Sequence, residues 1–330
     1  MSTCPPWRIC LTEERGDMST AIEMVPTKNH GYSYERALTA SQKVNWRIED
    51  IIGGEKRLDF SKPFMPESLA RVELLDFLSA AEKRTLNQIR GNSYLCIFGV
   101  VEEFILPFLM DHARPLLRGD DYRVRALLQF AGEEAKHIHL FNRFREEFNN
   151  GFSTNCDVIG PPEAIGQAVL GHDPLSVALV ILQIEWMTQR HYLESVKDDQ
   201  ELDPLFKSLL KHHWMEEAQH ARLDVLVVEA LAEARSRLGI EKAVEEYLEI
   251  GAFIDDGLKA QTQFDLEAFE RSTGRTLTVS ERERFVAVQT QANRWTYLGS
   301  GMTHPNFQAT LQGLLPEARV RVEQIAPLFC

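Results

Sequence analysis

The chain has 330 residues, of which 44% are hydrophobic and 26% are charged, and its formal net charge is −13. This much apolar sequence can bury a substantial core, and the negative charge argues against nucleic acid and anionic membranes as partners, because both attract a basic face. The five cysteines are scattered and form no Cys-x-x-Cys unit. They indicate neither a disulfide framework nor a thiolate metal site, and they favour a reducing, cytoplasmic location.

The start of the chain carries no apolar segment of the signal-peptide kind, and we expect residues 1–30 to be a poorly ordered extension. Residues 31–330 are expected to form one helical domain. The most apolar run, Tyr94–Met110, is interrupted by Glu102 and Glu103 and is short for a membrane span. We therefore expect no membrane association.

Between Tyr32 and Pro66 we expect short helices and loops that lie across a bundle. Four longer helices should follow, since each has a clear start signal: a capping box at Ser79–Glu82, an Asp cap at 120 or 121, and Asp-Pro pairs at 173–174 and 203–204. These helices are predicted at 80–113, from the Asp cap to about 149, at about 174–198 and at about 204–236. The Gly- and Pro-rich segment 152–171 is predicted to be a loop.

Three more helices are predicted after Gly239, at about 240–272, about 279–298 and 316–329. We find no alternating strand pattern of any length and no Gly-rich phosphate loop. The sequence therefore predicts an all-α protein, with a four-helix bundle at about 80–236 and additional helices on both sides of it.

The sequence FAGEEAKH returns later as HWMEEAQH, and each copy has a Glu three residues before a His. The pairs are Glu134 with His137 and Glu217 with His220, at an offset of 83 residues (217 − 134). Residues i and i+3 lie on one face of a helix, so each pair can direct both side chains at one point. One such pair is weak evidence for a metal site, whereas two matched pairs are much stronger.

Two further glutamates follow the same repeat. Glu102 and Glu185 are also 83 residues apart (185 − 102), and each precedes its own motif Glu by 32 residues. The helical register places Glu102, rather than Glu103, on the apolar face. Four helices thus offer Glu, Glu-x-x-His, Glu and Glu-x-x-His, which is the ligand set of a two-metal carboxylate site in a bundle. The alternative, a duplicated hairpin with solvated acids, is disfavoured because unpaired buried carboxylates are costly.

His213 breaks the symmetry of the repeat. It lies four residues before Glu217 and seven before His220, on the same helix face, and its counterpart in the first half is Phe130 (213 − 83). As a third imidazole it would make the two ions inequivalent; the alternative is a histidine hydrogen-bonded inside the bundle. The predicted metal ligands are Glu102, Glu134, His137, Glu185, His213, Glu217 and His220.

Several neighbouring residues have two open interpretations. Glu133 and Glu216, each just before a ligand Glu, could hold a histidine ring by its free N–H or could be solvated surface charges. Asp224 is a further candidate for such a supporting role. Tyr94 and Tyr192 could be redox-active or simply packed.

The remaining histidines are expected to lie outside the site. His139 and His212 point elsewhere on their helices and are predicted at the surface. His304, in Thr-His-Pro, is predicted to start a helix.

The whole layout resembles the ferritin-like di-iron carboxylate proteins. The sequence His213-x-x-x-Glu217-x-x-His220 is similar to the p-aminobenzoate N-oxygenase branch of that superfamily, as is the lead-in Met-Pro-Glu-Ser at 65–68 followed by Leu-Ser-Ala-Ala-Glu at 78–82. Both motif copies here read Glu-Glu where many relatives have Asp-Glu. The resemblance spans about residues 40–235. It implies a ferritin-like bundle, the same seven ligands, and oxidation of an amine nitrogen.

We therefore expect a di-iron oxygenase that activates O₂ at a carboxylate- and histidine-bridged centre and oxidises a small organic substrate. Two iron ions are the expected cofactor, with manganese or a mixed pair as alternatives, because the donors are oxygen and imidazole without thiolate. An external electron donor is required, and a homodimer is the expected assembly. Substrate should enter beside the metals, among Phe98, Phe130, Leu182 and Trp186. The alternative function is iron storage or peroxide detoxification, as in ferritins and rubrerythrins.

Overall fold

The computed structural model describes residues 31–330, so the expectation of poor order at 1–30 lies outside the described residues. The described part is all-α and contains no strand. The predicted bundle is confirmed, and each of its helices begins at the predicted signal. Its members are α4 (Ala80–Ala113), α5 (Asp121–Gly151), α7 (Pro174–Arg190) and α8 (Pro204–Glu233).

Additional helices lie on both sides of the bundle in the sequence. The N-terminal ones are α1 (Tyr34–Ser41), α2 (Ile48–Ile51) and α3 (Glu67–Ala70). The later ones are α6 (Pro162–Leu170), α9 (Arg237–Thr273), α10 (Val279–Arg294), α11 (Ser300–Met302), α12 (Pro305–Leu314) and α13 (Pro316–Ile325). Short 3₁₀ or π turns occupy Val72–Leu74, Arg114–Leu116, His191–Val196, Trp295–Gly299 and Ala326–Phe329.

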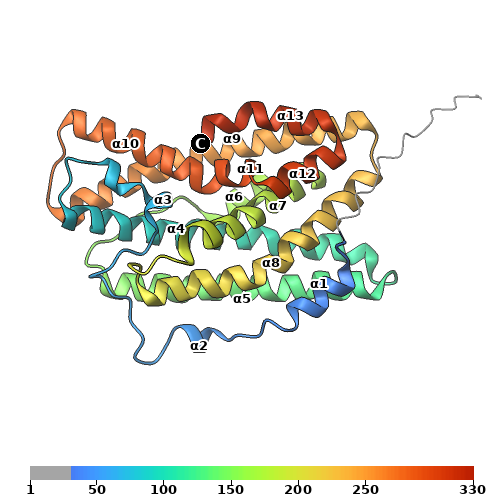
Figure 1. Ribbon diagram of the computed structural model, residues 1–330, viewed down its shortest axis with the longest axis horizontal. Coiled ribbons are helices and arrows are strands. Elements are labelled where there is room, and N and C mark those ends of the chain that lie inside the picture. The colour runs from blue at the N-terminus through green and yellow to red at the C-terminus, as the bar shows by residue number, and fades with distance from the viewer. Residues whose placement is uncertain (1–30) are drawn as a thin grey trace, which may run out of the picture.

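Two layers are visible in Figure 1. The long helices α5 and α8 run along one side of the molecule, with α1 packed against both of them, while α9, α10 and α13 form the opposite side. Helices α4 and α7 lie between and contact both layers: α4 packs against α5, α6 and α9, and α7 packs against α8, α9 and α11. One contiguous hydrophobic core runs through both layers, from Ala37 to Phe329.

Parts of the predicted secondary structure are wrong. The helix predicted at about 279–298 ends at Arg294 and continues as a π turn, and two further departures lie nearer the site. The segment 152–171 is not only a loop, because Pro162 occupies the first turn of α6, where its missing N–H is no loss. The third bundle helix ends as an α-helix at Arg190 and continues as a π turn, His191–Val196, rather than as one helix to 198. Both departures matter for function, since α6 and this turn border the cavities described below.

A close approach between layers depends on Gly301. A Cβ atom built there would lie 2.6 Å from the backbone oxygen of Gln183 on α7, closer than real Cβ contacts come. The absence of a side chain therefore lets α11 lie against α7. Gln183 itself donates to the Tyr297 carbonyl at 3.1 Å and accepts from Tyr247, so this face of α7 is fixed to the C-terminal helices.

One helix of the described residues, the continuous stretch 80–116, is long and apolar enough by length and composition to cross a membrane. A single helix of this kind is weak evidence for a span, because the buried core helix of a soluble protein passes the same test. In this helix 61% of the most apolar window is buried, and Arg90 and Glu102 are buried polar groups within it.

A buried polar network joins α4 to α9 and α10. The Arg90 guanidinium lies 3.7 Å from the Asp265 carboxylate and donates to Asn293, and both charged side chains are almost fully buried. Asp265 also accepts from Ser93 at 2.5 Å and from Gln261 at 2.9 Å. A buried pair of this kind is costly to break on one side only, because the remaining charge loses its partner.

We predict that Asp265→Ala will destabilise the protein by about 3–5 kcal/mol, because it leaves Arg90 buried without a counter-charge. The double variant Arg90→Met/Asp265→Leu should cost much less, since neither charge remains. Denaturant unfolding followed by circular dichroism measures both values. Equal losses in the single and double variants would show that the pair is not what holds these helices together.

His304 begins α12, as predicted. Its side chain accepts a hydrogen bond from the Asn306 amide at 3.2 Å and stacks on Trp186, with ring centroids 5.0 Å apart. Burial, assisted by the positive charge of Arg190, lowers the pKa of His304 to about 4. The neutral ring is therefore the form that caps this helix.

The pH dependence of stability tests this cap. The unfolded-state pKa is about 6.5, so the unfolded chain takes up a proton first as pH falls, and the native state loses stability between about 6.5 and about 4 with no further loss below. His304→Asn keeps an acceptor at the cap and does not titrate. We predict that wild type will lose about 1 kcal/mol relative to this variant across that range, after allowing for partial exposure. Parallel pH curves for the two proteins would contradict the assignment.

Candidate metal centre

All seven predicted ligands lie on the four bundle helices, and none is more than 3% exposed. Glu102 is on α4, Glu134 and His137 are on α5, Glu185 is on α7, and His213, Glu217 and His220 are on α8. The predicted register of α4 is confirmed, because Glu102 is buried while its neighbour Glu103 is exposed.

Six of the seven converge in two overlapping groups. Within each group the candidate ligand atoms all lie within 4.8 Å of one another. The first group is Glu102, His137, His213 and Glu217, and the second is Glu134, His137, Glu217 and His220. Each group offers two carboxylates and two imidazoles, so the arrangement can hold two metal ions.

Glu217 stands at the centre of the arrangement. Its Oε1 lies 2.9 Å from His213 Nε2 and 3.0 Å from His137 Nδ1, while its Oε2 lies 3.2 Å from His220 Nδ1. Each oxygen therefore faces a different end of the site, as a carboxylate that bridges two ions requires.

The other two acids of the groups, Glu102 and Glu134, each contact a histidine at one end of the site. Glu102 Oε1 lies 3.1 Å from His213 Nε2, and Glu134 Oε1 lies 2.8 Å from His220 Nδ1. Glu185 belongs to neither group. It is buried on α7 beside them, and burial together with the negative charge of Glu217 raises its pKa well above the ordinary value.

The site fits a cation by a direct criterion, because many of its buried ligand atoms make no hydrogen bond within residues 31–330. These atoms are Glu102 Oε2, both carboxylate oxygens of Glu134, Glu185 Oε2, Glu217 Oε1 and His137 Nδ1. Native proteins pair nearly all buried polar atoms, since each unpaired one costs on the order of 1–3 kcal/mol. Several such atoms pointing at one another are stable together only with positive charge between them.

The pKa shifts of the site residues also indicate that the site attracts positive charge. Burial raises the pKa of Glu217, but the imidazoles of His213 and His220 outweigh burial and hold it well below its ordinary value. Burial lowers the pKa of His137, yet the neighbouring glutamates, beginning with Glu134, raise it well above the ordinary value. The acids therefore attract positive charge strongly, and divalent ions can provide it in place of protons.

Glu133 and Glu216 are buried, which excludes the interpretation as solvated surface charges. Each lies beside the histidine of the opposite motif: Glu133 Oε2 is 2.8 Å from His220 Nε2, and Glu216 Oε2 is 2.8 Å from His137 Nε2. With Nε2 occupied in this way, both rings turn Nδ1 toward the centre. Such partners fix the ring and raise the basicity of the nitrogen that would bind a metal. They also join α5 to α8 in both directions.

Three residues that support this layer were missed by the sequence analysis. Ser41 at the end of α1 donates to Glu133, and Lys136 on α5 donates to Glu216. Trp46 stacks on the His137 ring at 6.0 Å, and the Lys136 ammonium lies 3.7 Å from the Trp46 ring centroid. Lys136 could have been noticed because it directly precedes His137 in the motif. Ser41 and Trp46 carry no local signal, since tertiary folding alone brings them to the site.

The two halves of the repeat differ at one matched position. His213 lies edge-on to His137 with ring centroids 4.6 Å apart, whereas its counterpart Phe130 stacks on His220 at 3.9 Å. Each residue thus packs against the histidine of the other motif, and only one of them offers a donor atom. The two ends of the site are therefore chemically unequal.

The other candidates divide as follows. His139 is exposed, as predicted, but His212 is half-buried, with Nδ1 bonded to the Ser208 carbonyl at 2.7 Å.

Asp224 is buried one turn past His220 but makes no hydrogen bond to that ring. Both of its carboxylate oxygens are without hydrogen-bond partners among the described residues. Burial raises its pKa well above the ordinary value. Tyr94 and Tyr192 both pack on aromatic neighbours.

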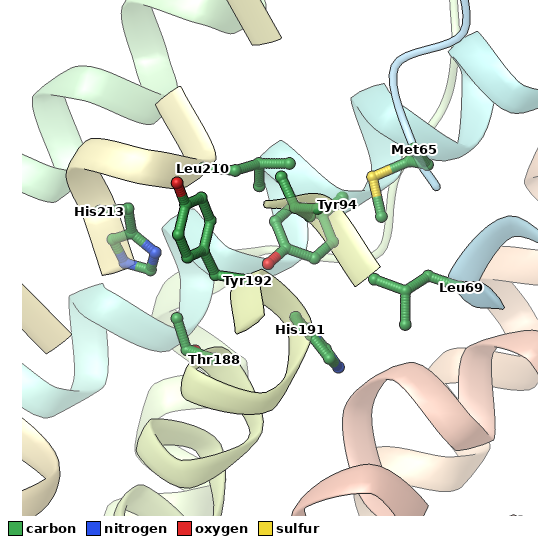
Figure 2. Close-up of a pocket in the computed structure, with 9 residues that line it drawn as sticks. Met65, Leu69, Tyr94, Thr188, His191, Tyr192, Leu210 and His213 are labelled. Atoms are coloured by element: carbon green, nitrogen blue, oxygen red, sulfur yellow. The ribbon is translucent and has the colours of Figure 1, made fainter. Parts of the chain in front are cut away.

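A small pocket adjoins His213. Its volume is about 10 Å³, close to the least space that holds one water molecule. Figure 2 shows His213 at one side of this pocket and Met65 and Leu69 at the other. Tyr94, Tyr192 and His191 also line it, so its wall is partly polar beside a predicted ligand.

The expected apolar pocket lies elsewhere. Of the four residues predicted to line it, only Phe98 borders the larger cavity, which lies between α4, α6, α7 and α9. Phe130 is instead packed on His220, and Trp186 is packed on His304.

Comparison with known proteins gives a likeness of structure only. No family model and no curated protein matches the chain. Among solved structures, a variant of an R2-like ligand-binding oxidase with an aerobically reconstituted Mn/Fe cofactor is 14% identical, with a TM-score of 0.42 over 84% of this chain and 99% of that one. An Fe/Fe form of such an oxidase is 14% identical, with a TM-score of 0.42 over 81% and 94%. At these values the likeness assigns neither a family nor an activity to this chain.

We predict that the purified chain will bind two divalent ions and that they will stabilise it. At free metal one hundred times above the dissociation constant, the gain is about 2.7 kcal/mol. Glu134→Gln should lose most of this gain, and its metal-free form should be no less stable than metal-free wild type, since a buried charge has been removed. Thermal unfolding with and without a chelator measures these differences. A wild-type protein indifferent to metal would contradict the site.

A second prediction concerns the unequal ends. His213→Phe makes position 213 match Phe130. It should weaken the binding of one of the two ions by at least about tenfold, because replacing even a residue that only supports a ligand lowers metal affinity by that factor. The other ion should keep its affinity. Chelator competition titrations resolve the two steps, and His139→Phe, at an exposed position on α5, is the control. Equal weakening of both ions would show that His213 is not a ligand of one end.

Proposed function

We propose that this protein is a di-iron oxidase of the oxygenase type, which binds two iron ions among the seven predicted ligands and uses O₂ to oxidise a small organic molecule. The observation that carries the proposal is the cluster of unpartnered carboxylate and imidazole atoms around Glu217, buried inside a four-helix bundle. Oxygen and imidazole donors without thiolate suit iron or manganese, so a manganese or mixed pair is the alternative loading.

The residues of the chain have separate tasks in this proposal. Glu217 reaches both ends of the site, and Glu102 and Glu134 each serve one end. Two ferrous ions, when bound, would supply electrons for the reduction of O₂. Glu133 and Glu216 keep the rings of His220 and His137 in position, so the donor atoms stay aimed at the centre when the charge there changes.

The surroundings exclude bulk water from the centre. Phe98, Phe130 and Phe141 are almost fully buried, and each packs its ring against a ligand imidazole. A dry, low-dielectric site strengthens electrostatic interactions and limits loss of oxidising equivalents to solvent. This favours chemistry on a substrate over release of reduced oxygen species.

The reaction proposed for such a site is insertion of one oxygen atom into the substrate, with oxidation of an amine nitrogen as the specific candidate. One atom of O₂ enters the product and the other leaves as water, which requires two electrons and two protons from outside. The chain has no flavin, nicotinamide or iron–sulfur motif. An external electron donor is therefore part of the proposal.

Anaerobic loading with ferrous iron followed by O₂ tests the function. We predict O₂ uptake near one molecule per two irons, with a transient visible absorbance band, because paired irons react with O₂ as a unit. Glu134→Gln should abolish both signals, whereas His139→Gln, at an exposed position on α5, should keep them.

The size of the assembly and the number of irons bound per chain distinguish an oxygenase from an iron-storage protein. Slow uptake of many irons per chain in a large hollow multimer would replace the oxygenase with iron storage. Two bound irons that do not consume O₂ would leave only a structural role for the metals.

A further inference from the structure

The larger cavity is a built feature of the fold. Its volume is about 260 Å³. An engineered protein cavity of about 150 Å³ lined by Leu, Ile and Phe holds benzene, so this one has room for a benzene ring with substituents. Its walls come from α4, α6, α7 and α9, the loop before α6 and the turn after α10. The lining side chains include Ile97, Phe98, Val100, Val101, Phe104, Ile165, Val169, Ile184, Met187, Phe253, Ile254, Leu258 and Tyr297.

The lining contains almost no polar side chain. Among residues 31–330, no Lys, Arg or His borders the cavity, and the one acid on its lining is Asp256. The Asp256 side chain is 78% exposed and lies 2.9 Å from the Lys259 ammonium, so it is a solvated rim residue rather than a buried anchor. A charged ligand group would therefore lose its hydration without gaining a partner, which costs several kcal/mol.

Buried and exposed parts of the lining come from different elements. Most residues from α4 and α7, such as Ile97 and Met187, are buried. Several residues from α9 and from the loop before α6 are exposed: Phe253 is 43% exposed, and Asp256 and Gly160 are also exposed. The cavity therefore reaches from the surface at α9 into the wall of the bundle.

Its inner wall adjoins the metal centre. Phe98 lines the cavity, and the same ring lies 5.5 Å from the His213 ring in an edge-on contact. Phe98 is also one turn before Glu102 on α4, and Ile184, another lining residue, directly precedes Glu185 on α7. Phe98 thus touches both the cavity and the ring of a predicted ligand.

We propose that this cavity binds an uncharged, largely hydrocarbon molecule about the size of a substituted benzene and that this is the substrate class of the centre behind Phe98. The inference rests on the proposed function for the oxidation, but not for the binding. An uncharged aromatic amine belongs to this class. Its carboxylated counterpart does not, because the lining formed by the described residues has no cation to receive a carboxylate.

A matched pair of probes tests the charge preference on the full-length, metal-loaded protein. 4-Methylaniline and 4-aminobenzoate share a ring and an amine and differ in a methyl group against a carboxylate. At pH 7.5, titration calorimetry should show 4-methylaniline binding at least about tenfold more tightly. Equal or tighter binding of 4-aminobenzoate would overturn the proposal.

A filling variant locates the binding. Ile254→Phe adds a ring to the lining from α9, away from every predicted ligand, and should weaken 4-methylaniline at least about tenfold by removing space. Ile325→Phe, at another half-buried isoleucine on α13, is the matched control and should bind as wild type does. If Ile254→Phe does not fold, Ile165→Phe on α6 makes the same test from another wall. Unchanged binding in a folded filling variant would overturn the location.

The proposed binding and the proposed oxidation can be tested independently of each other. The same titration on metal-depleted protein should still show 4-methylaniline binding, because the cavity walls are hydrocarbon. Binding without O₂ consumption would remove the proposed function and keep the cavity as a ligand site. O₂ consumption with no binding of the neutral probe would do the reverse and overturn the inference.

Discussion

The structure depends on one electrostatic constraint: several carboxylates are buried at the same place. Glu102, Glu134, Glu185 and Glu217 come from all four bundle helices, and many of their oxygens have no hydrogen-bond donor in the part of the chain that the structure describes. Like charges in a dry interior repel strongly, so the bundle can close around them only with cations, or protons, between them. The free energy of packing these four helices therefore depends on positive charge bound between the carboxylates. The histidines nearest Glu217 mark the position of that charge.

Around this centre the fold adds a second set of contacts that crosses the bundle. Glu133 on α5 holds the α8 histidine and Glu216 on α8 holds the α5 histidine, so neither helix can rotate without releasing a ring. The N-terminal segment closes the arrangement through Ser41 and Trp46. The C-terminal part of the chain does not contact the centre in this way. Its helix α9 and the turn after α10 enclose the apolar cavity together with α4, α6 and α7. The close contact of Gly301 with α7 fixes the position of these C-terminal helices.

Much of the centre was predictable, because its information is local. A Glu three residues before a His specifies one face of one helix, and the 83-residue repeat doubles the signal; Glu102 followed from the same spacing and is buried as expected. What a helical period cannot give is the partner across the bundle. The sequence left Glu133 undecided, missed Ser41 and Trp46, and placed Phe130 in a pocket when it packs on His220. The cavity was unpredictable for the same reason, since seven of its 17 lining residues come from α6, expected as loop, and from α9, which has no motif.

The crossing carboxylates are not equivalent, and this has a consequence for the metals. Glu216, the partner of His137, is paired with the ammonium of Lys136, whereas Glu133, the partner of His220, accepts from the neutral groups of Ser41 and Gln129. A carboxylate that keeps its full negative charge pushes more electron density through the imidazole it holds. Of the two matched imidazoles, His220 is thus held by the more fully charged carboxylate, and its inward Nδ1 would be the stronger electron donor to an ion placed there.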